Sequence, residues 1–495
     1  MRAKILFTLL LINLSFPLFS QKTPAKFAGF NLKFKINGLK DTVAYLAGYY
    51  GPKQYFKDTA KVDSQGNLAF KGKDSLPGGI YSVVMPDKGT YFEFIVNEQS
   101  FSMETDTGNF VRAMKVKGSV ENEIFYKRLN YLEQKQKEIN PHKAILDDSL
   151  KTEDEKKIAR EKLSAIEKEI KEYTLNVVKE NPNTFLAKVF KAMEEPETPD
   201  APLLENGQKD SLFPFKYYKE HFFDNVDFQD DRLLRSPVFH NKMEKYLNKL
   251  TLQHPDSISA AADFMAAKAR GTKEMFKYIV HYVTSTYEKS NIMGMDAVFV
   301  HMAQNYYMKG EAFWIDTAQL AKITERANKL APILIGKKVI NVTLQDTGMT
   351  KWYSLYDVKA KYTLLIFWDP NCGHCKKVIP KIKELYDKYT DRSFFEVFGV
   401  GTEFEDKDWS KFIKEHNLNW INVSDNPEIN KNYAKYIQFT NIESLNFRQT
   451  FDIYATPVIF LLNDKKEIIA KKIDSEQIED LLERFKKKEE KKEGN

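Results

Sequence analysis

The two cysteines of this chain stand in a single tetrapeptide, Cys372-Gly373-His374-Cys375. The apolar run 362–368 precedes it, and a helical pattern over 372–389 follows. A strand that delivers a Cys-x-x-Cys pair to the start of a helix is the arrangement that a reversible dithiol requires. The sequence therefore predicts an α/β region built around this pair.

Residues 1–20 have the pattern of a secretory signal peptide. Arg2 and Lys4 are basic, residues 5–16 are mostly apolar, and Ser20 marks the expected cleavage point. An uncleaved anchor is the alternative interpretation. We expect export to the periplasm or cell envelope, with no membrane span after cleavage. In an oxidising compartment a lone Cys-x-x-Cys is either a catalytic dithiol or a short structural disulfide.

The charge pattern argues against nucleic acid as a partner. The chain has 75 Lys and Arg residues against 69 Asp and Glu residues, for a formal net charge of +6. Charges of both signs in nearly equal number are typical of a mixed, solvated surface, whereas nucleic-acid binders concentrate positive charge.

Hydrophobic periodicity predicts two different structures for residues 27–190. Residues 27–115 alternate between apolar and polar positions and contain regular turn signals, which predicts a β-sandwich. Residues 119–190 follow a three- and four-residue period, which predicts a helical hairpin whose first helix, 121–139, ends at Asn140-Pro141. The hairpin is interpreted either as an arm for dimerisation or partner contact or as a solvated spacer.

The remaining residues predict a mostly α-helical domain over 205–331 and an α/β domain over 335–485. The stripe of aromatic and methionine residues in the helical part is more typical of a packed core than of a ligand site. Residues 486–495 are a charged tail.

Cys372 is the predicted attacking thiolate, because backbone N–H groups and the positive end of the helix dipole stabilise a negative sulfur at a helix N-terminus. His374, Lys376 and Lys377 add positive potential. Cys375, one turn further on, is the predicted resolving thiol. The expected reaction is thiol–disulfide exchange through a mixed disulfide.

Three further features surround the pair. Trp368 lies four residues before Cys372, Pro380 lies eight residues after it, and Thr456-Pro457 precedes the apolar run 458–462. With this spacing, residues 335–485 resemble thioredoxin-fold proteins, in particular the exported TlpA/ResA-like thiol–disulfide oxidoreductases of the AhpC/TSA–redoxin superfamily. The order of the regions is similar to multidomain envelope proteins of Bacteroidetes-type bacteria.

The resemblance implies that Pro457 is cis and lies against the active disulfide, and that the backbone of Thr456 hydrogen-bonds the bound substrate chain. The Gly-His dipeptide is similar to that of protein disulfide isomerases, so that reductase and isomerase both remain open. The supporting active-site residues implied by the resemblance are Trp368, Gly373, His374, Pro380, Thr456 and Pro457.

Two positions depart from the family pattern. The buried Asp of thioredoxins is replaced by Ile366, and the Glu of cytochrome c-maturation members is replaced by Val378. Both acidic groups would accept the proton of the resolving thiol. Their absence leaves His374 or water for this task. The segment 424–452 is also longer than a thioredoxin needs, and we interpret it as part of a partner-binding face.

Other uses of the pair are disfavoured. A disulfide across two intervening residues closes a very small loop and removes little unfolded-state entropy. Zinc needs more ligands than two Cys and one His, and haem attachment needs His at position 376, which is Lys. Peroxiredoxins carry Thr or Ser where this chain has Asp369. No metal and no cofactor is expected.

The sequence therefore predicts an enzyme, an exported thiol–disulfide oxidoreductase that acts as a reductase or an isomerase on protein thiols and disulfides of the envelope. A membrane electron donor is a candidate partner. The alternative is a non-catalytic binding or redox-sensing protein that recognises its partner through the N-terminal and middle regions.

Overall fold

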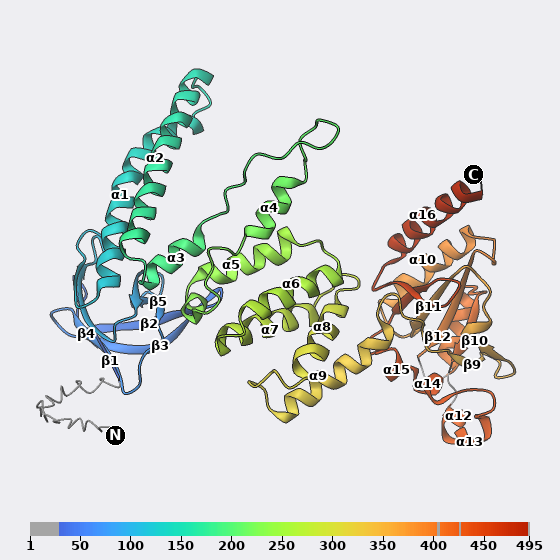
Figure 1. Ribbon diagram of the computed structural model, residues 1–495. Helices are drawn as coiled ribbons and strands as arrows, with labels where there is room; N and C mark the ends of the chain where they lie inside the picture. The colour runs from blue at the N-terminus through green and yellow to red at the C-terminus, as the bar shows by residue number, and fades with distance from the viewer. Residues whose placement is uncertain (1–28, 403–405, 425–426, 494–495) are drawn as a thin grey trace, which may run out of the picture. The chain divides into compact units, whose positions relative to one another are not determined.

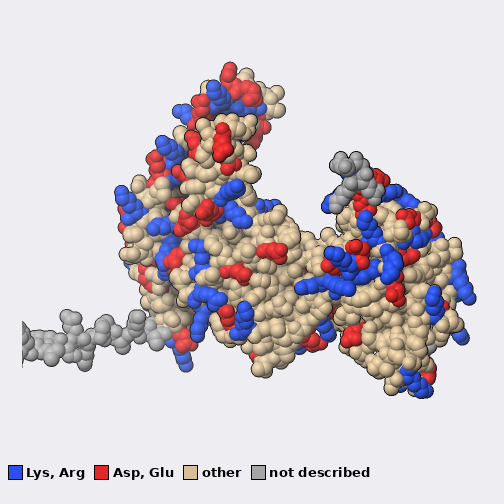
Figure 2. Space-filling model, turned by 45° about the vertical axis from the view of Figure 1, so that its right-hand side comes forward, with Lys and Arg blue, Asp and Glu red and all other residues tan. Residues whose placement is uncertain are grey.

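The computed structural model describes residues 29–402, 406–424 and 427–493. The predicted signal peptide lies outside the described residues. The chain forms two compact units, one ending at Lys191 and including Arg235–Pro237, the other holding residues 192–234 and everything after Pro237. On the face shown in Figure 2, basic and acidic side chains are interspersed, and no described helix is long and apolar enough to cross a bilayer.

The N-terminal region is β-rich, as predicted. Its strands form two four-stranded sheets, one in the order β4-β1-β7-β8 and the other in the order β3-β2-β5-β6. The strands are β1 (Phe30–Asn37), β2 (Thr42–Tyr50), β3 (Lys53–Val62), β4 (Asn67–Gly72), β5 (Gly79–Val84), β6 (Tyr91–Val96), β7 (Ser100–Asp106) and β8 (Lys115–Lys117).

Side-chain alternation builds the core of this region. Leu32, Phe34 and Ile36 of β1 are buried, whereas the residues between them face outward, because successive side chains of a strand point to opposite faces. The ring centroids of Phe34 and Phe94 lie 5.1 Å apart. The two residues stand in different sheets, so the inner faces of both sheets contribute to one apolar cluster.

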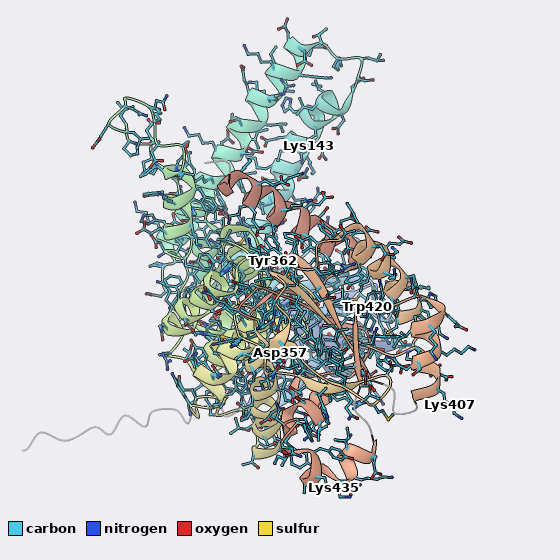
Figure 3. All side chains as sticks on the ribbon, turned by 90° about the vertical axis from the view of Figure 1, so that its right-hand side faces the viewer. Lys143, Asp357, Tyr362, Lys407, Trp420 and Lys435 are labelled. Atoms are coloured by element: carbon cyan, nitrogen blue, oxygen red, sulfur yellow. The ribbon has the colours of Figure 1, made fainter. Side chains whose placement is uncertain are left out.

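The hairpin consists of α1 (Val120–Asp147) and α2 (Glu153–Glu180), with Lys143 near its far end (Figure 3). The prediction that Asn140-Pro141 ends the first helix is wrong, since α1 continues for six residues beyond Pro141. A proline inside a helix removes one backbone hydrogen bond and costs about 3 kcal/mol. Contacts with α2 offset this cost, among them the stacked rings of Tyr131 and Tyr173, 4.0 Å apart.

The middle region is helical, as predicted. It begins with α3 (Phe185–Met193), whose first N–H groups donate to the buried Glu121 carboxylate at 2.6 and 3.0 Å. Six further α-helices follow, and we call them the helical region. These are α4 (Phe213–His221), α5 (Pro237–Lys245), α6 (Pro255–Lys268), α7 (Lys273–Glu288), α8 (Asp296–Met302) and α9 (Thr317–Leu330). Helices α5 and α8 each continue into a π-helical turn.

The C-terminal domain contains a seven-stranded sheet in the order β10-β9-β13-β12-β11-β14-β15. Strand β11 is parallel to β12 and antiparallel to β14, which places it inside the sheet. The strands are β9 (Thr343–Asp346), β10 (Trp352–Ser354), β11 (Tyr362–Trp368), β12 (Phe395–Gly401), β13 (Ile421–Ser424), β14 (Val458–Leu462) and β15 (Ile468–Lys471). The helices are α10 (Cys375–Lys388), α11 (Asp406–Glu415), α12 (Pro427–Lys431), α13 (Tyr433–Tyr436), α14 (Ile442–Leu445), α15 (Phe447–Thr450) and α16 (Ser475–Glu493).

Each face of this sheet has its own apolar layer. One layer joins Leu364 and Ile366 of β11 to α10, α11 and α16, and α10 and α16 lie side by side over this face (Figure 1). The other layer joins Leu365 and Phe367 to α14 and α15, and it also includes Phe299 of α8 and residues of α9. The helical region therefore covers part of the sheet of the C-terminal domain.

A buried ion pair crosses the same boundary. The Lys471 ammonium on β15 lies 2.5 Å from Asp296 at the start of α8 and also donates to the Ile333 carbonyl oxygen at 2.6 Å. The exposed fractions of the two charged side chains are 4% and 5%. A buried charge is tolerated only when it is paired and hydrogen-bonded, so each partner depends on the other.

We expect Lys471→Met to destabilise the second unit by about 3–5 kcal/mol, because it leaves the Asp296 carboxylate buried without its counter-ion. The double variant Asp296→Leu/Lys471→Met should recover most of this loss. All five tryptophans of the chain lie in the second unit, so urea unfolding followed by tryptophan fluorescence measures it selectively. Lys465→Met, at an exposed turn position, is the control and should change little. Additive losses in the double variant would contradict the coupling.

Candidate active site

Strand β11 and helix α10 position the two cysteines. Strand β11 ends at Trp368, and Asp369 then organises the turn: its side chain accepts from the Asn371 N–H at 2.7 Å, and its carbonyl oxygen accepts from the Cys372 N–H at 3.2 Å. The helix begins at Cys375, three residues later than the sequence pattern indicates. Cys372 thus precedes the first turn of α10, and the free N–H groups of that turn face it.

The Cys372 sulfur is half-buried, and both cysteines are free thiols. Its thiol donates to the carbonyl oxygen of Thr456, with the sulfur and oxygen 3.2 Å apart. Partial burial alone would raise the pKa of Cys372. Hydrogen bonds from the Cys375 backbone N–H, the Thr456 and Cys375 side chains and the His374 backbone N–H outweigh burial, so the pKa lies below the usual value of a thiol. The site therefore favours a thiolate at position 372.

The Cys375 sulfur has the opposite environment. It is fully buried in the apolar layer beneath α10. Burial, together with the neighbouring Cys372, raises the pKa of Cys375 to about 11, although the Asp369 backbone N–H and the Thr456 side chain act against the shift. At neutral pH this thiol stays protonated. The two sulfurs of the tetrapeptide are thereby assigned different chemical states.

Trp368 lies away from solvent, below the turn that carries the cysteines. It is fully buried, with its ring centroid 5.3 Å from that of Phe412 and 6.2 Å from that of Trp409. Its carbonyl oxygen accepts from the Thr402 N–H at 2.9 Å, which ties the end of β11 to the end of β12. These contacts fix the point from which the cysteine turn departs.

The other residues of the predicted motif have separate environments. Gly373 is exposed, and a Cβ added there would meet nothing within 4 Å, so packing does not require glycine. His374 is the N-cap residue of α10 and is exposed. Pro380 lies inside α10 and is half-buried; without an N–H it leaves the carbonyl oxygen of Lys376 without its helical partner.

The Thr456–Pro457 peptide bond is cis, as the resemblance implies. The structure brings Thr456 against Cys372 through the hydrogen bond described above. His374, Thr456 and Pro457 also line one cavity of about 560 Å³. Of the predicted residues, Cys372, Cys375, His374, Thr456 and Pro457 thus form one site, whereas Trp368 and Pro380 lie behind it.

Several residues of this cavity had no signal in the sequence. Asp452 pairs with Arg326 across 126 positions of the chain, and both line the cavity together with Glu288 and Asn291 of the helical region. No motif spacing joins such distant positions. No group of three or more His, Cys, Asp or Glu side chains that could hold a metal occurs among the described residues.

The chain is similar to known proteins in several regions. Residues 335–471 match the AhpC/TSA family model. Residues 30–125 and 152–331 match two families described as domains of unknown function, DUF4369 and DUF5106. Thiol-disulfide oxidoreductase ResA from Bacillus thuringiensis subsp. konkukian and from Bacillus cereus are each 28% identical over 155 residues, which is 31% of this chain and 78% of the relative.

Two solved structures are also similar. A domain of a possible thiol-disulfide isomerase from Cytophaga hutchinsonii is 39% identical, covering 32% of this chain and 99% of that chain, with a TM-score of 0.27. A thioredoxin-like protein from Bacteroides caccae is 20% identical, covering 58% of this chain and 98% of that chain, with a TM-score of 0.43.

The two sulfurs should differ in their alkylation by iodoacetamide. In Cys375→Ser, Cys372 should react faster at pH 7 than a free cysteine, because a lowered pKa increases the thiolate fraction, and the midpoint of its rate profile should fall below the ordinary value of about 8.5. In Cys372→Ser, the midpoint for Cys375 should stay above the ordinary value, because burial, the largest cause of its raised pKa, remains after the contribution of Cys372 is lost. Two identical profiles, both centred on the ordinary value, would show that the environments do not act as described.

Proposed function

The C-terminal domain of this chain is a thioredoxin-like thiol–disulfide oxidoreductase domain of the ResA type, and from this premise we propose that the chain exchanges disulfides with exported proteins through Cys372 and Cys375. The proposal is supported by the different environments of the two thiols, which lower the pKa of Cys372 and raise the pKa of Cys375. One sulfur is prepared to attack, and the other is kept protonated until it is needed.

The exchange proceeds in two displacements. The Cys372 thiolate attacks one sulfur of a substrate disulfide, a new S–S bond forms, and the other substrate sulfur leaves as a thiolate that takes up a proton. Cys375 then loses its proton and attacks the Cys372 sulfur. This step releases the second substrate sulfur and leaves a Cys372–Cys375 disulfide. The substrate gains two electrons from the dithiol and two protons, one from Cys375 and one from the solvent, because Cys372 enters the reaction as a thiolate.

The neighbouring backbone supports substrate binding. The Thr456 carbonyl oxygen lies at hydrogen-bond distance from the Cys372 sulfur, so a peptide segment that delivers its own sulfur to Cys372 comes within reach of this carbonyl. We propose that Thr456 binds the substrate main chain and that Pro457, which has no N–H, forms the adjoining surface. His374, exposed at the N-cap, is the proposed proton carrier for Cys375, with water as the alternative carrier.

The state of Cys375 favours isomerisation over net reduction. Resolution of the mixed disulfide requires the Cys375 thiolate. Burial, the largest cause of the raised pKa of Cys375, persists when Cys372 is bonded to the substrate sulfur and keeps this thiolate scarce. The apolar residues Ile366 and Val378 stand where relatives carry proton acceptors. A mixed disulfide that resolves slowly gives the substrate's own free thiols time to attack, which rearranges its disulfides without net reduction.

The proposed setting is the cell envelope, with export directed by residues 1–20. The proposed partners are envelope proteins with thiols or disulfides. Isomerisation consumes no electrons, but the dithiol must be returned to the reduced state whenever Cys375 completes a resolution. A membrane electron donor is the proposed source of these electrons.

The first test compares Cys372→Ser with Cys375→Ser in two assays, refolding of a scrambled disulfide protein and reduction of insulin. Cys372→Ser should lose both activities, because no attacking thiolate remains. Cys375→Ser should lose insulin reduction, keep part of the refolding activity, and accumulate mixed disulfides that are visible on a non-reducing gel. Refolding activity that survives Cys372→Ser would refute the proposed mechanism.

A second test restores the missing proton acceptor. Val378 follows Cys375 by three positions on α10, so the two side chains lie on the same helix face, and Val378 is only partly buried. We expect Val378→Glu to accelerate insulin reduction by about tenfold, which is less than the roughly 10²–10⁴-fold contribution of an optimised general base, and to lower the ratio of isomerisation to reduction. Val378→Gln, which has the same shape without a basic oxygen, is the control. Equal rates in both variants would mean that proton removal from Cys375 does not limit resolution.

A further inference from the structure

The cavity beside the dithiol is bounded partly by the helical region. Its volume is about 560 Å³, and we call it the dithiol cavity. His374, Val378, Thr456 and Pro457 form its redox side. The end of β15 and the start of α16 contribute Lys471, Lys472, Ile473, Asp474 and Gln477. The opposite side comes from the helical region, through Glu288, Asn291, Asp296, Arg326, Leu330 and Ile333.

This wall is held in place by reciprocal charges. The helical region contributes Asp296 and Arg326, and the C-terminal domain contributes their partners Lys471 and Asp452. Each side thus supplies one acid and one base. The apolar layer shared by α8, α9 and the sheet adds a continuous packed contact. These ion pairs and the shared apolar layer join the wall to the C-terminal domain.

Three lining side chains keep their charge outside these two ion pairs, the negative Glu288 and Asp474 and the positive Lys472. Lys472 donates to the Ser290 carbonyl oxygen at 3.3 Å, and Asp474 accepts from the Gln477 N–H at 2.8 Å at the start of α16. Glu288 is exposed at the rim. Asp452 uses one carboxylate oxygen for Arg326, whereas its other oxygen, Oδ1, is buried and has no hydrogen-bond partner among the described residues.

The unpaired oxygen Oδ1 of Asp452 indicates which kind of ligand the cavity can bind. The Asp452 side chain is 7% exposed, and a buried acceptor without a donor costs about 1–3 kcal/mol. Since Asp452 lines the cavity, a donor that enters the cavity can remove this cost. A cationic donor would also be attracted by Glu288 at the rim.

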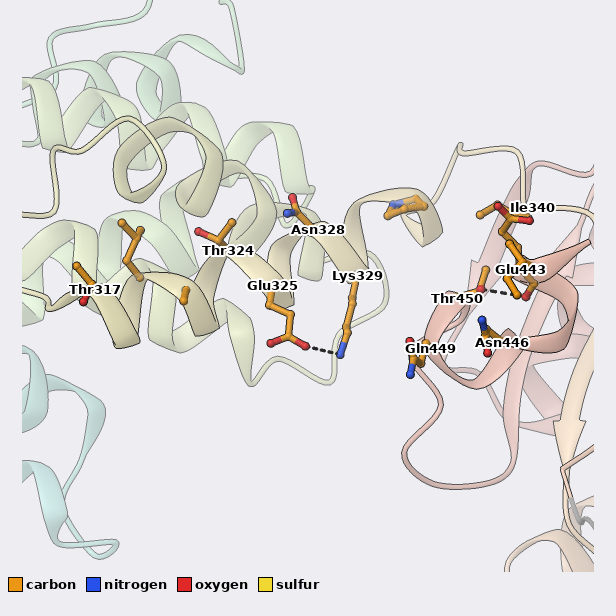
Figure 4. Close-up of a pocket in the computed structure, with 14 residues that line it drawn as sticks. Thr317, Thr324, Glu325, Asn328, Lys329, Ile340, Glu443, Asn446, Gln449 and Thr450 are labelled. Carbon is orange, nitrogen blue, oxygen red and sulfur yellow. Dashed lines mark hydrogen bonds and ion pairs between the residues drawn. The ribbon is translucent and has the colours of Figure 1, made fainter. Parts of the chain in front are cut away.

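A second, larger cavity shows the contrast. It has a volume of about 840 Å³ and lies between α9 and the α14–α15 segment (Figure 4). Its polar lining includes groups that already have partners, Glu325 with Lys329 and the Thr450 hydroxyl with the Glu443 carbonyl oxygen. None of the predicted site residues lines it. The dithiol cavity combines an unsatisfied acceptor with proximity to the reacting sulfur.

We propose that the dithiol cavity receives a lysine or arginine side chain of the substrate protein, so that the helical region selects substrates with a basic residue close to the reacting cysteine. This inference rests on the proposed function, because the peptide enters the cavity as its sulfur approaches Cys372. The basic group donates to Asp452 Oδ1 and is attracted by Glu288. The helical region then acts as a specificity element of the redox site.

The test uses the full-length chain without its first 20 residues, in reduced form, and three peptides that each carry one cysteine as a mixed disulfide with thionitrobenzoate. The peptides differ at one position near the cysteine, which is arginine, norleucine or glutamate. Release of the coloured thiolate gives the second-order rate constant for each. The arginine peptide should react about three- to tenfold faster than the norleucine peptide, in the range expected for one partly screened charge interaction, and added salt should reduce the difference.

Charge reversal at the rim provides the decisive variant. Glu288→Lys changes an exposed side chain and should invert the order, so that the glutamate peptide becomes the preferred one. Asp256→Lys makes the same charge change on α6, outside the cavity, at a side chain that is 94% exposed, and should keep the preference for arginine. Asp452→Asn should weaken that preference without inverting it.

The two proposals fail in different ways. Equal rates for the three peptides, with Cys372 still reacting, would overturn the specificity inference and leave the exchange chemistry standing. Loss of the preference in Asp256→Lys as well would show a general charge effect and would also overturn it. No reaction of any peptide with Cys372 would instead overturn the proposed function.

Discussion

The chemistry of this site depends on where the backbone places N–H groups around one sulfur. The Cys372 thiol lies just before α10, where the first N–H groups of a helix have no intrahelical partner, and two of them, from His374 and Cys375, lower its pKa. The neighbouring Cys375 belongs to the helix itself and is buried in its apolar layer. A displacement of three residues along the chain therefore separates an ionisable thiol from a protonated one. The buried Trp368 and the pairing of β11 with β12 and β14 hold the end of β11 in place, and the cysteine turn starts from there.

The helical region contributes to the redox domain in two ways. It covers part of one face of the sheet with apolar residues of α8 and α9, and it joins the sheet through the buried pair of Asp296 and Lys471. An apolar sheet face must be buried against another layer of secondary structure. Here the cover comes from residues that precede the domain in sequence, and the same cover forms the wall of a cavity beside the reacting sulfur.

Local patterns in the sequence were sufficient to predict the dithiol and the strand before it, whereas the cis bond of Pro457 followed from the family resemblance. Trp368, Cys372, Cys375 and Pro457 all belong to short motifs whose spacing reflects one continuous piece of fold. The start of the helix was predicted three residues early, because the apolar period does not distinguish a turn from the first helical turn. The pattern also failed at Pro141, where packing of α1 against α2 outweighs the helix-breaking tendency of proline.

The charged wall of the cavity could not be predicted in this way. Arg326 and Asp452 meet only because the helical region folds back on the sheet, and neither residue stands in a motif. One consequence of the shared apolar layer concerns modular exchange. A cut at position 335 would uncover the sheet surface on which Phe299 and Leu330 pack. A graft of the redox domain that also carried α8 and α9 would keep this apolar surface covered as it is in the whole chain.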